Sequence, residues 1–225
     1  MINKLKRVAY LEAKIVSNVG SGKYYKRLFD IAVSAMLLLC LLPFFLVIAI
    51  FIRLDSRGPV FFKQIRFGRY GKLFILYKFR TMTDFPRQAV DEVMPGNPEV
   101  TSVGVILRRF KIDELPQLWN VLRGDMSIVG PRPGIADQLK DLNDVGKKRL
   151  LVRPGLTGLA QVHGNIYLPW SERWRYDAEY VEKQSFILDC WILWRTLFVI
   201  IGGEKPKQNS RVAESADSNN NGQTR

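Results

Sequence analysis

An apolar run of 22 residues without a charged side chain, from Ile31 to Ile52, constrains this chain more than any other feature. A helix needs roughly 20 mostly apolar residues to cross the hydrocarbon core of a bilayer, which is about 30 Å thick. The run is too long for the apolar part of a cleaved signal peptide, and no small-residue cleavage site follows it. The sequence therefore predicts a helix in contact with a membrane.

Pro43 interrupts this run and leaves 12 apolar residues before it and 9 after it. Because proline removes a backbone hydrogen bond and kinks or breaks a helix, the two pieces are roughly 18 and 13 Å long, too short to span alone. Basic residues flank both ends, with Lys26 and Arg27 before the run and Arg53 and Arg57 after it. Basic flanks favour the cytoplasm, so a re-entrant helix that turns at Pro43 satisfies both. A spanning helix with a proline kink stays open as an alternative.

The charge balance indicates an anionic partner. The chain has 34 Lys and Arg against 21 Asp and Glu, a net charge of +13. Such a surplus suits nucleic acid, a phosphorylated substrate or lipid headgroups. The two cysteines, Cys40 and Cys190, form no C-x-x-C pair, and His163 is the one histidine. These counts argue against a disulfide framework, a zinc site and a Ser-His-Asp relay.

Strand-like and helical patterns follow the apolar run. The segments "PVFFKQIRFG" and "LFILYKFRTM" are rich in Val, Ile, Phe and Tyr, and "RYGK" between them predicts a hairpin turn. "MSIV" is a short strand candidate, and helices are expected at about 135–150 and 171–183. Residues 186–201 are apolar but contain Asp189, Arg195 and two tryptophans, a mixture typical of a helix in the membrane interface.

Two adjacent acids, Asp113 and Glu114, stand in the stretch "IDELPQLWN" directly after several basic residues. Apolar residues at i, i+3, i+4 and i+7 predict a helix over 114–123 that ends at Gly124, with Asp113 at or near its N-cap. Asp is a preferred N-cap residue, and acids favour the positive end of a helix dipole. The pair therefore has an ordinary structural explanation.

The surroundings of the pair also suit phosphate chemistry. A helix N-terminus attracts phosphate groups, and Arg108 and Lys111 bring positive charge close by in the chain. Arg132 stands between two prolines in "GPRPG", which predicts a stiff turn and a positioned anion contact. With a magnesium ion, a carboxylate here could bind the metal or attack phosphorus, and its neighbour could manage a proton. The residues alone allow both explanations.

Several segments, in order and over roughly residues 24–201, resemble the monotopic phosphoglycosyl transferases. This bacterial sugar transferase family begins the assembly of lipid-linked glycans. The matching segments are "KRLFD", the proline-interrupted apolar run, "GPVFFKQIRFG", "YKFRTM", "KIDELPQLWNVLRGDMSIVGPRP" and "RPGLTGLAQVHG". The long central motif is the most specific of them.

The resemblance implies a reaction and a set of site residues. Asp113 matches the family nucleophile, which attacks the β-phosphate of a UDP-sugar, releases UMP and holds the phosphosugar covalently. Polyprenyl phosphate, usually undecaprenyl phosphate, then accepts the phosphosugar. Glu114 matches the second acid, which assists in proton handling or acceptor activation, and Mg2+ is expected at Asp113. The implied substrate-binding residues are Arg108, Arg132, Pro133, Arg153, Gln161, Lys78 and Arg80.

The resemblance also implies a fold and a location. We expect an α/β, mainly helical, monotopic domain anchored by a re-entrant helix and by interfacial amphipathic helices. It would lie on the cytoplasmic face of the bacterial inner membrane and serve exopolysaccharide or lipopolysaccharide biosynthesis. The expected division is a basic amphipathic segment (1–22), a re-entrant membrane helix (23–54), a cytoplasmic catalytic domain (55–201) and a disordered tail (202–225).

Some positions depart from the family pattern, and two rival functions deserve comparison. Leu159 and His163 replace a common Trp and Asn, and Leu42 replaces the Ser that often precedes the proline. The changes at Leu159 and His163 bear on the sugar or the local packing and leave the reaction in place, whereas Leu42 removes part of the polar support for the bend at Pro43.

A membrane-tethered nucleic-acid-binding protein lacks any recognisable motif here, so we expect no nucleic acid partner. A non-catalytic scaffold would not need the acidic pair. The sequence leaves open the sugar, the pathway and whether the chain forms a homodimer.

Overall fold

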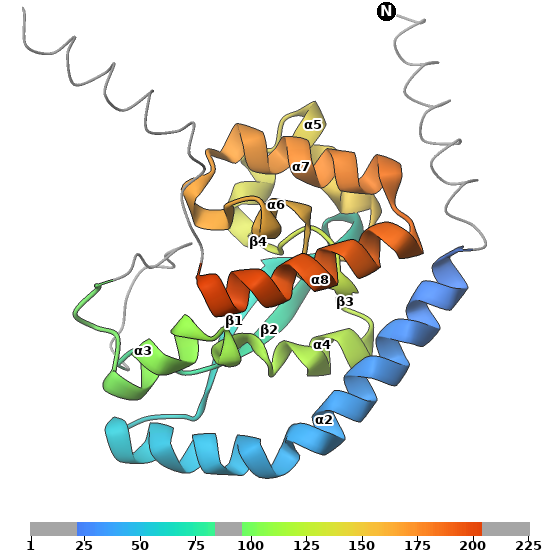
Figure 1. Ribbon diagram of the computed structural model, residues 1–225. Helices are drawn as coiled ribbons and strands as arrows, with labels where there is room; N and C mark the ends of the chain where they lie inside the picture. Colours follow the sequence, from blue (N-terminus) through green and yellow to red (C-terminus); the bar gives the residue numbers. More distant parts are fainter. Residues whose placement is uncertain (1–21, 84–95, 204–225) are drawn as a thin grey trace, which may run out of the picture.

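The computed structural model describes residues 22–83 and 96–203 of the chain (Figure 1). The segments expected at 1–22 and 202–225 lie outside the described residues, apart from their boundary positions. In chain order the main elements are α2 (Gly22–Asp55), β1 (Phe61–Phe67), β2 (Leu73–Phe79), α3 (Ser102–Arg109), α4 (Gln117–Arg123), β3 (Ser127–Val129), β4 (Gly134–Ile135), α5 (Asp144–Lys147), β5 (Gly155–Thr157), α6 (Leu159–Val162), α7 (Trp170–Lys183) and α8 (Phe186–Gly202). Short 3-10 turns join them, so the described part is mixed α/β and mainly helical, as expected.

The apolar run forms one helix, α2, of 34 residues with Pro43 inside it. Its Tyr24–Asp55 part is long and apolar enough to cross a membrane, by length and composition. The sequence predicted two pieces separated at the proline, whereas the helix is continuous and its ribbon changes direction partway along (Figure 1). One proline removes a single backbone donor, so a helix can bend there and continue.

Both ends of α2 are fastened to the rest of the protein. Near its start, Arg27 donates two hydrogen bonds to the carbonyls of Val121 (2.6 Å) and Leu122 (2.9 Å), at the end of α4. Near its end, the buried Arg80 donates to the carbonyl of Ser56 at 2.6 Å. The ends of the apolar helix therefore rest on one domain, while side chains in its middle such as Leu39 are exposed.

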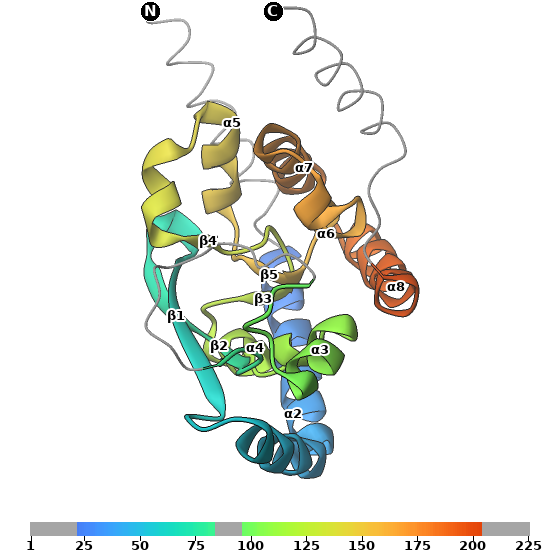
Figure 2. The same ribbon diagram turned by 90° about the vertical axis from the view of Figure 1, so that its left-hand side faces the viewer.

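Two small sheets organise the domain. β1 and β2 form the predicted antiparallel hairpin, in a register that runs from Phe61 opposite Phe79 to Phe67 opposite Leu73, and β4 adds to the other edge of β1. β3 and β5 form a separate parallel pair. In Figure 2, this pair lies between the hairpin on one side and α7 and α8 on the other. The main hydrophobic core is built around it.

Glycines allow the parallel pair to come unusually close. A Cβ atom at Gly155 would lie 2.1 Å from the backbone nitrogen of Gly130, and one at Gly158 would lie 2.1 Å from its carbonyl oxygen. Any larger residue would collide with main-chain atoms that cannot move aside. The N–H of Gly155 donates to the carbonyl of Pro131 at 2.8 Å. This contact fixes the start of the "GPRPG" turn.

The helices of the C-terminal half agree in part with the sequence. α7 and α8 confirm the helical patterns at 171–183 and 186–201. The helix predicted at about 135–150 is wrong, because the segment consists of two 3-10 turns with the short α5 between them. The side chain of Asn143 accepts the N–H of Gly146 at 2.8 Å and caps α5 as a new start. The cap separates α5 from the 3-10 turn before it (Ala136–Asp141), so no single helix covers 135–150.

Candidate active site

The acidic pair lies in a 3-10 turn, Ile112–Glu114, ahead of α4. The sequence predicted Asp113 at or near the N-cap of a helix over 114–123, but the N-cap position is Pro116 and the helix begins at Gln117. The backbone bonds in this stretch join residues three apart, with the N–H of Leu115 donating to the carbonyl of Ile112 at 3.1 Å and that of Leu118 to the carbonyl of Leu115 at 3.0 Å, so the α-helical pattern begins later. α4 ends at Gly124, as expected, with a left-handed φ of 93°.

The backbone directly before this turn is strained. Lys111 adopts a left-handed conformation, with φ 58° and ψ 18°. For a residue with a Cβ atom this conformation costs roughly 1 kcal/mol. Strained residues of this kind gather at functional sites, where the surrounding structure holds them in place. The turn that carries both acids is therefore set by its tertiary surroundings.

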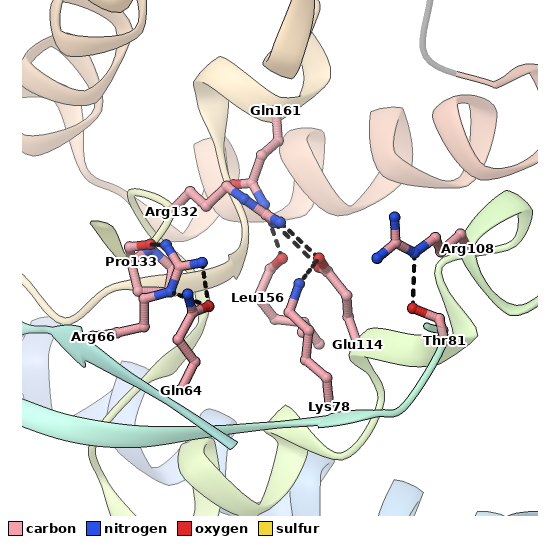
Figure 3. A network of polar contacts seen from close by, with 10 residues as sticks. All are labelled: Gln64, Arg66, Lys78, Thr81, Arg108, Glu114, Arg132, Pro133, Leu156 and Gln161. Atoms are coloured by element: carbon pink, nitrogen blue, oxygen red, sulfur yellow. Dashed lines mark hydrogen bonds and ion pairs between the residues drawn. The ribbon is translucent and has the colours of Figure 1, made fainter. Parts of the chain in front are cut away.

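Glu114 is held by two cations (Figure 3). Lys78 donates to its Oε1 at 2.7 Å, and Arg132 donates to Oε1 at 2.8 Å and to Oε2 at 3.3 Å. Burial alone would raise the pKa of Glu114, but Arg132 and Lys78 outweigh it and hold that pKa well below its ordinary value. A carboxylate of low pKa is a weak base. The geometry suits Glu114 to orienting its two cations.

Asp113 is as buried as its neighbour, at 7% exposure, but its carboxylate is not committed to a partner. Burial raises the pKa of Asp113, opposed by the positive charge of Lys78 and reinforced by the negative charge of Glu114. Within the described residues no hydrogen bond reaches this carboxylate, and the cations act on it through charge alone. Asp113 is therefore the member of the pair that is available to a ligand or to an electrophile.

The cations around the pair come from separate segments of the chain. Lys78 is on β2, Arg132 lies in the turn after β3, and Arg108 is in the last turn of α3. Arg108 donates to the hydroxyl of Thr81 at 2.8 Å. In Figure 3, Glu114 lies between the guanidinium groups of Arg66 and Arg108. The fold thus brings together the two acids and three of the predicted basic residues. This arrangement favours a phosphorylated ligand.

Hydrogen bonds from outside the "GPRPG" turn hold its backbone, in addition to its prolines. Arg149 donates to the carbonyl of Arg132, and Arg66 donates to the carbonyl of Pro133 at 3.2 Å. Together with the bond from Gly155, these contacts engage three successive carbonyls of the turn. Pro133 thus contributes through its backbone carbonyl, which helps to hold the turn that carries Arg132.

Arg132 also lines a narrow cleft, whose wall does not include Lys78. Gln161 lines it, and its Oε1 is buried without a hydrogen-bond partner in the described structure, while Nε2 donates to the carbonyl of Leu156 at 3.0 Å. An unpartnered buried acceptor is costly unless a ligand or water satisfies it. The polar residues that share this wall are Arg66, Arg132, Arg149, Asn165, Arg173 and Asp177.

Sequence reasoning missed four charged residues of this cleft. Asp177 pairs with Arg149 at 3.2 Å, and burial raises the pKa of Asp177 to about 6 against the opposing charges of Arg149 and Arg173. Arg173 and Asp177 belong to an amphipathic helix, where charged residues usually face solvent. Arg66 belongs to a strand whose other face carries apolar residues. The sequence contains no signal that these side chains are buried together.

The structure places two predicted site residues away from the pair. Arg80 comes directly after β2, which ends at Phe79. Because Arg80 lies outside the strand, its side chain does not have to share the face of Lys78. It donates instead to the carbonyl of Ser56, at the end of α2. Arg153 donates through Nε to the carbonyl of Gly124 at 2.9 Å, at the far end of α4 from Asp113. Neither side chain lines the cleft beside Arg132.

The donor groups of the site fit a magnesium ion that is shared with a substrate. Among the described residues there is no group of three or more His, Cys, Asp and Glu that could hold a metal. Magnesium, however, is commonly bound by one or two carboxylates together with substrate phosphates and water. The oxygens of Glu114 already accept hydrogen bonds from Lys78 and Arg132. Asp113 is thus the residue that would hold such an ion.

The chain is similar to known proteins over most of its length. The profile of the family described as "Bacterial sugar transferase" matches residues 21–203. The chain is 42% identical over 187 residues to the uncharacterized sugar transferase EpsL of Bacillus subtilis, covering 83% of this chain and 92% of that protein. It is 35% identical over 192 residues to the exopolysaccharide production protein ExoY of Rhizobium meliloti, covering 78% and 85%. It is 38% identical over 188 residues to the UDP-glucose:undecaprenyl-phosphate glucose-1-phosphate transferase of Escherichia coli, covering 80% of this chain and 40% of that protein.

Proposed function

Because this chain belongs to the bacterial sugar transferase family, we propose that it transfers a sugar-1-phosphate from a UDP-sugar to undecaprenyl phosphate during polysaccharide synthesis. The names of the relatives from Escherichia coli and Salmonella typhimurium support this acceptor. The observation that carries the proposal is a buried, uncommitted Asp113 beside a Glu114 that two cations hold in place.

In the first half-reaction an oxygen of the Asp113 carboxylate attacks the β-phosphorus of the UDP-sugar. A bond forms between that oxygen and phosphorus, and the bond from phosphorus to the bridging oxygen breaks with its electron pair, so UMP leaves. In the second half-reaction a phosphate oxygen of undecaprenyl phosphate attacks the same phosphorus. The Asp113 carboxylate is released, and the product is undecaprenyl diphosphate sugar. Two displacements of this kind divide one difficult transfer into two easier ones.

The neighbouring residues prepare the phosphate for attack. Arg132 and Lys78, both fixed by Glu114, supply positive charge where the transferred phosphoryl group gains negative charge. Arg108 supplies a third cation from α3. Glu114 acts mainly by positioning Arg132 and Lys78, in keeping with its low pKa. The uncommitted Oε1 of Gln161 offers an acceptor in the adjoining cleft, which we assign to the nucleotide end of the donor.

Mg2+ would be held by Asp113 together with the diphosphate of the donor. When bound, the ion would neutralise part of the phosphate charge that otherwise repels a carboxylate. The positive charges of Lys78 and Arg108, which act on Asp113, serve the same purpose from the protein side, so the carboxylate can approach phosphorus.

For topology, we propose that α2 enters the membrane and returns to the cytoplasmic face, which makes the protein monotopic. A straight helix of 34 residues is about 51 Å long, at about 1.5 Å per residue. Its ends could not both contact one domain on one side of a bilayer. The hydrogen bonds of Arg27 and Arg80 to that domain therefore support re-entry.

Cysteine labelling tests this topology. In a chain whose native cysteines are replaced by Ser, Tyr24→Cys and Arg57→Cys would each place a thiol at an exposed position beyond one end of the apolar run. We expect a membrane-impermeant maleimide to label neither residue in intact spheroplasts and both after lysis, because both ends lie in the cytoplasm. Labelling of Tyr24→Cys alone in intact spheroplasts would instead indicate a spanning helix.

The reaction itself is tested with a panel of UDP-sugars. Purified protein with Mg2+ should release UMP from at least one donor, with sustained turnover only when undecaprenyl phosphate is added. The UDP-sugar that supports turnover would also identify the sugar. If no donor of a broad panel yields UMP, the transferase proposal is wrong. A scaffold would remain inactive throughout, and a nucleic-acid-binding protein would instead bind DNA in a strongly salt-dependent way.

A further inference from the structure

A second cavity lies at the opposite end of α4 from Asp113. It has a volume of about 380 Å³ and shares no lining residue with the cleft beside Arg132. Its walls come from the start of α2, the turn after β1, the segment before β5 and the start of α8. α4 has seven residues and is therefore about 10 Å long. A group bound in this cavity is too far from Asp113 to react there.

Three arginines from different segments line this cavity, namely Arg27, Arg69 and Arg153. Arg153 uses Nε for its bond to the carbonyl of Gly124, so its two terminal nitrogens have no partner among the described residues. Arg69 donates through Nε to the carbonyl of Leu151 at 3.1 Å and through Nη2 to the hydroxyl of Tyr70 at 2.6 Å, which leaves Nη1 without a described partner. Arg69 and Arg153 thus keep donors for an anion, while Arg27, whose Nη1 and Nη2 donate to the carbonyls of Val121 and Leu122, contributes its positive charge.

The carboxylates in the same walls are already engaged. Asp189 pairs with Lys26 at 2.6 Å, and Asp30 accepts the backbone N–H of Ile128 at 3.0 Å.

Burial and the neighbouring charges of Arg27 and Arg69 lower the pKa of Arg153. Like charges therefore repel one another across the cavity, and an anion between them would relieve this repulsion.

The rim of the cavity is apolar and exposed. Tyr25 and Phe186 line it and are 78% and 65% exposed. They stand at the starts of α2 and α8, which lie beside each other in Figure 1, and Phe29 contacts Phe186 with ring centroids 5.9 Å apart. The cavity thus combines basic side chains in its wall with aromatic ones at its mouth, next to the helix that we assign to the membrane.

We propose that this cavity binds the headgroup phosphate of an anionic phospholipid, with the phosphate among Arg27, Arg69 and Arg153 and the acyl chains against Tyr25 and Phe186. Undecaprenyl phosphate offers the same chemistry, but a position at the far end of α4 from the reacting carboxylate favours a lipid that is not consumed. The bound lipid would contact the starts of both α2 and α8 and so link the two helices. It would thereby stabilise the attachment of the domain to an anionic membrane.

Native mass spectrometry of the full chain in a nonionic detergent tests this site. Phosphatidylglycerol, phosphatidylcholine, undecaprenyl phosphate and inorganic phosphate are added in parallel. We expect phosphatidylglycerol to bind about tenfold more tightly than phosphatidylcholine, and Arg69→Gln and Arg153→Gln each to weaken its binding about tenfold, because each removes a charge-assisted bond. Arg69→Lys keeps the charge and should lose less. Arg175→Gln, at an exposed arginine on α7, is the matched control and should bind as the unchanged chain does.

Several results would overturn the assignment. Equal affinity for phosphatidylglycerol in Arg69→Gln and the unchanged chain would show that the cavity does not hold the phosphate. Preference for undecaprenyl phosphate would make the cavity an acceptor site, and equal binding of inorganic phosphate would show that the acyl chains contribute nothing. Thermal unfolding without lipid identifies a variant that has lost its fold. Arg69, half-buried in a surface turn, provides the test if Arg153→Gln does not fold.

Discussion

Asp113→Asn is expected to abolish the covalent phosphosugar adduct and to lower UMP release at least about 10³-fold, as loss of a catalytic nucleophile does in other enzymes. Asn has nearly the same shape but cannot displace a phosphate leaving group in this way. The carboxylate has no hydrogen-bond partner among the described residues, so the variant should fold with a Tm close to that of the unchanged chain. Intact-protein mass spectrometry, after incubation with donor and Mg2+ but no acceptor, measures the adduct directly.

Asp144→Asn is the matched control for this experiment. Its side chain is exposed at 94% in the first turn of α5, and the substitution removes the same charge far from the pair. It should form adduct at the normal rate. An adduct that persists in Asp113→Asn would assign the nucleophile to another residue, and Glu114 would be the first to examine.

Glu114→Gln is expected to slow turnover about 10- to 100-fold while the adduct on Asp113 still forms. The amide leaves Lys78 and Arg132 without their shared carboxylate, so both cations lose the positions that the phosphate needs. A partly buried charge that loses its partner also lowers the free energy of unfolding, by about 1–3 kcal/mol. Glu114→Gln should therefore slow UMP release and adduct formation and lower Tm, whereas Asp113→Asn should abolish the adduct and leave Tm almost unchanged.

Glu179→Gln provides the comparison for the second variant. Glu179 pairs with Lys183 on the exposed face of α7, where ion pairs contribute little. It should leave turnover and Tm almost unchanged. Complete and lasting absence of the adduct in a folded Glu114→Gln chain would contradict the positioning role and would place Glu114 in the first chemical step.

Elements with a strong local pattern could be predicted from the sequence. The alternating strands around "RYGK", the helical periodicity of 171–183 and the uncharged run from Ile31 all correspond to elements of the structure. The pattern failed where the backbone hydrogen bonds changed. Asn143 begins a new helix within 135–150, and backbone bonds between residues three apart hold the acidic pair in a 3-10 turn ahead of α4. Both effects depend on particular backbone bonds, which periodicity does not detect.

The site could be predicted in part, for a similar reason. Asp113, Glu114, Arg108, Lys78 and Arg132 stand in motifs, and the fold brings them together. The cleft residues Arg66, Arg149 and Asp177 meet only because three elements distant in sequence pack side by side. Arg80 and Arg153 stand in equally specific motifs but support α2 and α4 instead. A motif indicates that a residue has a required contact, and the packing decides which contact that is.

The two attachments of α2 make its hold on the domain bivalent. If one end detaches, the other keeps it nearby, so the free end rebinds as an intramolecular event at a high effective concentration. Loss of either Arg27 or Arg80 alone would then leave the helix docked most of the time. Loss of both would weaken the docking by more than the sum of the two single losses, while the buried Ile48 and Ile52 and the ion pair of Lys26 with Asp189 would still hold the helix. Contacts at both ends of the bent helix thus keep the segment that we assign to the membrane docked on a small domain.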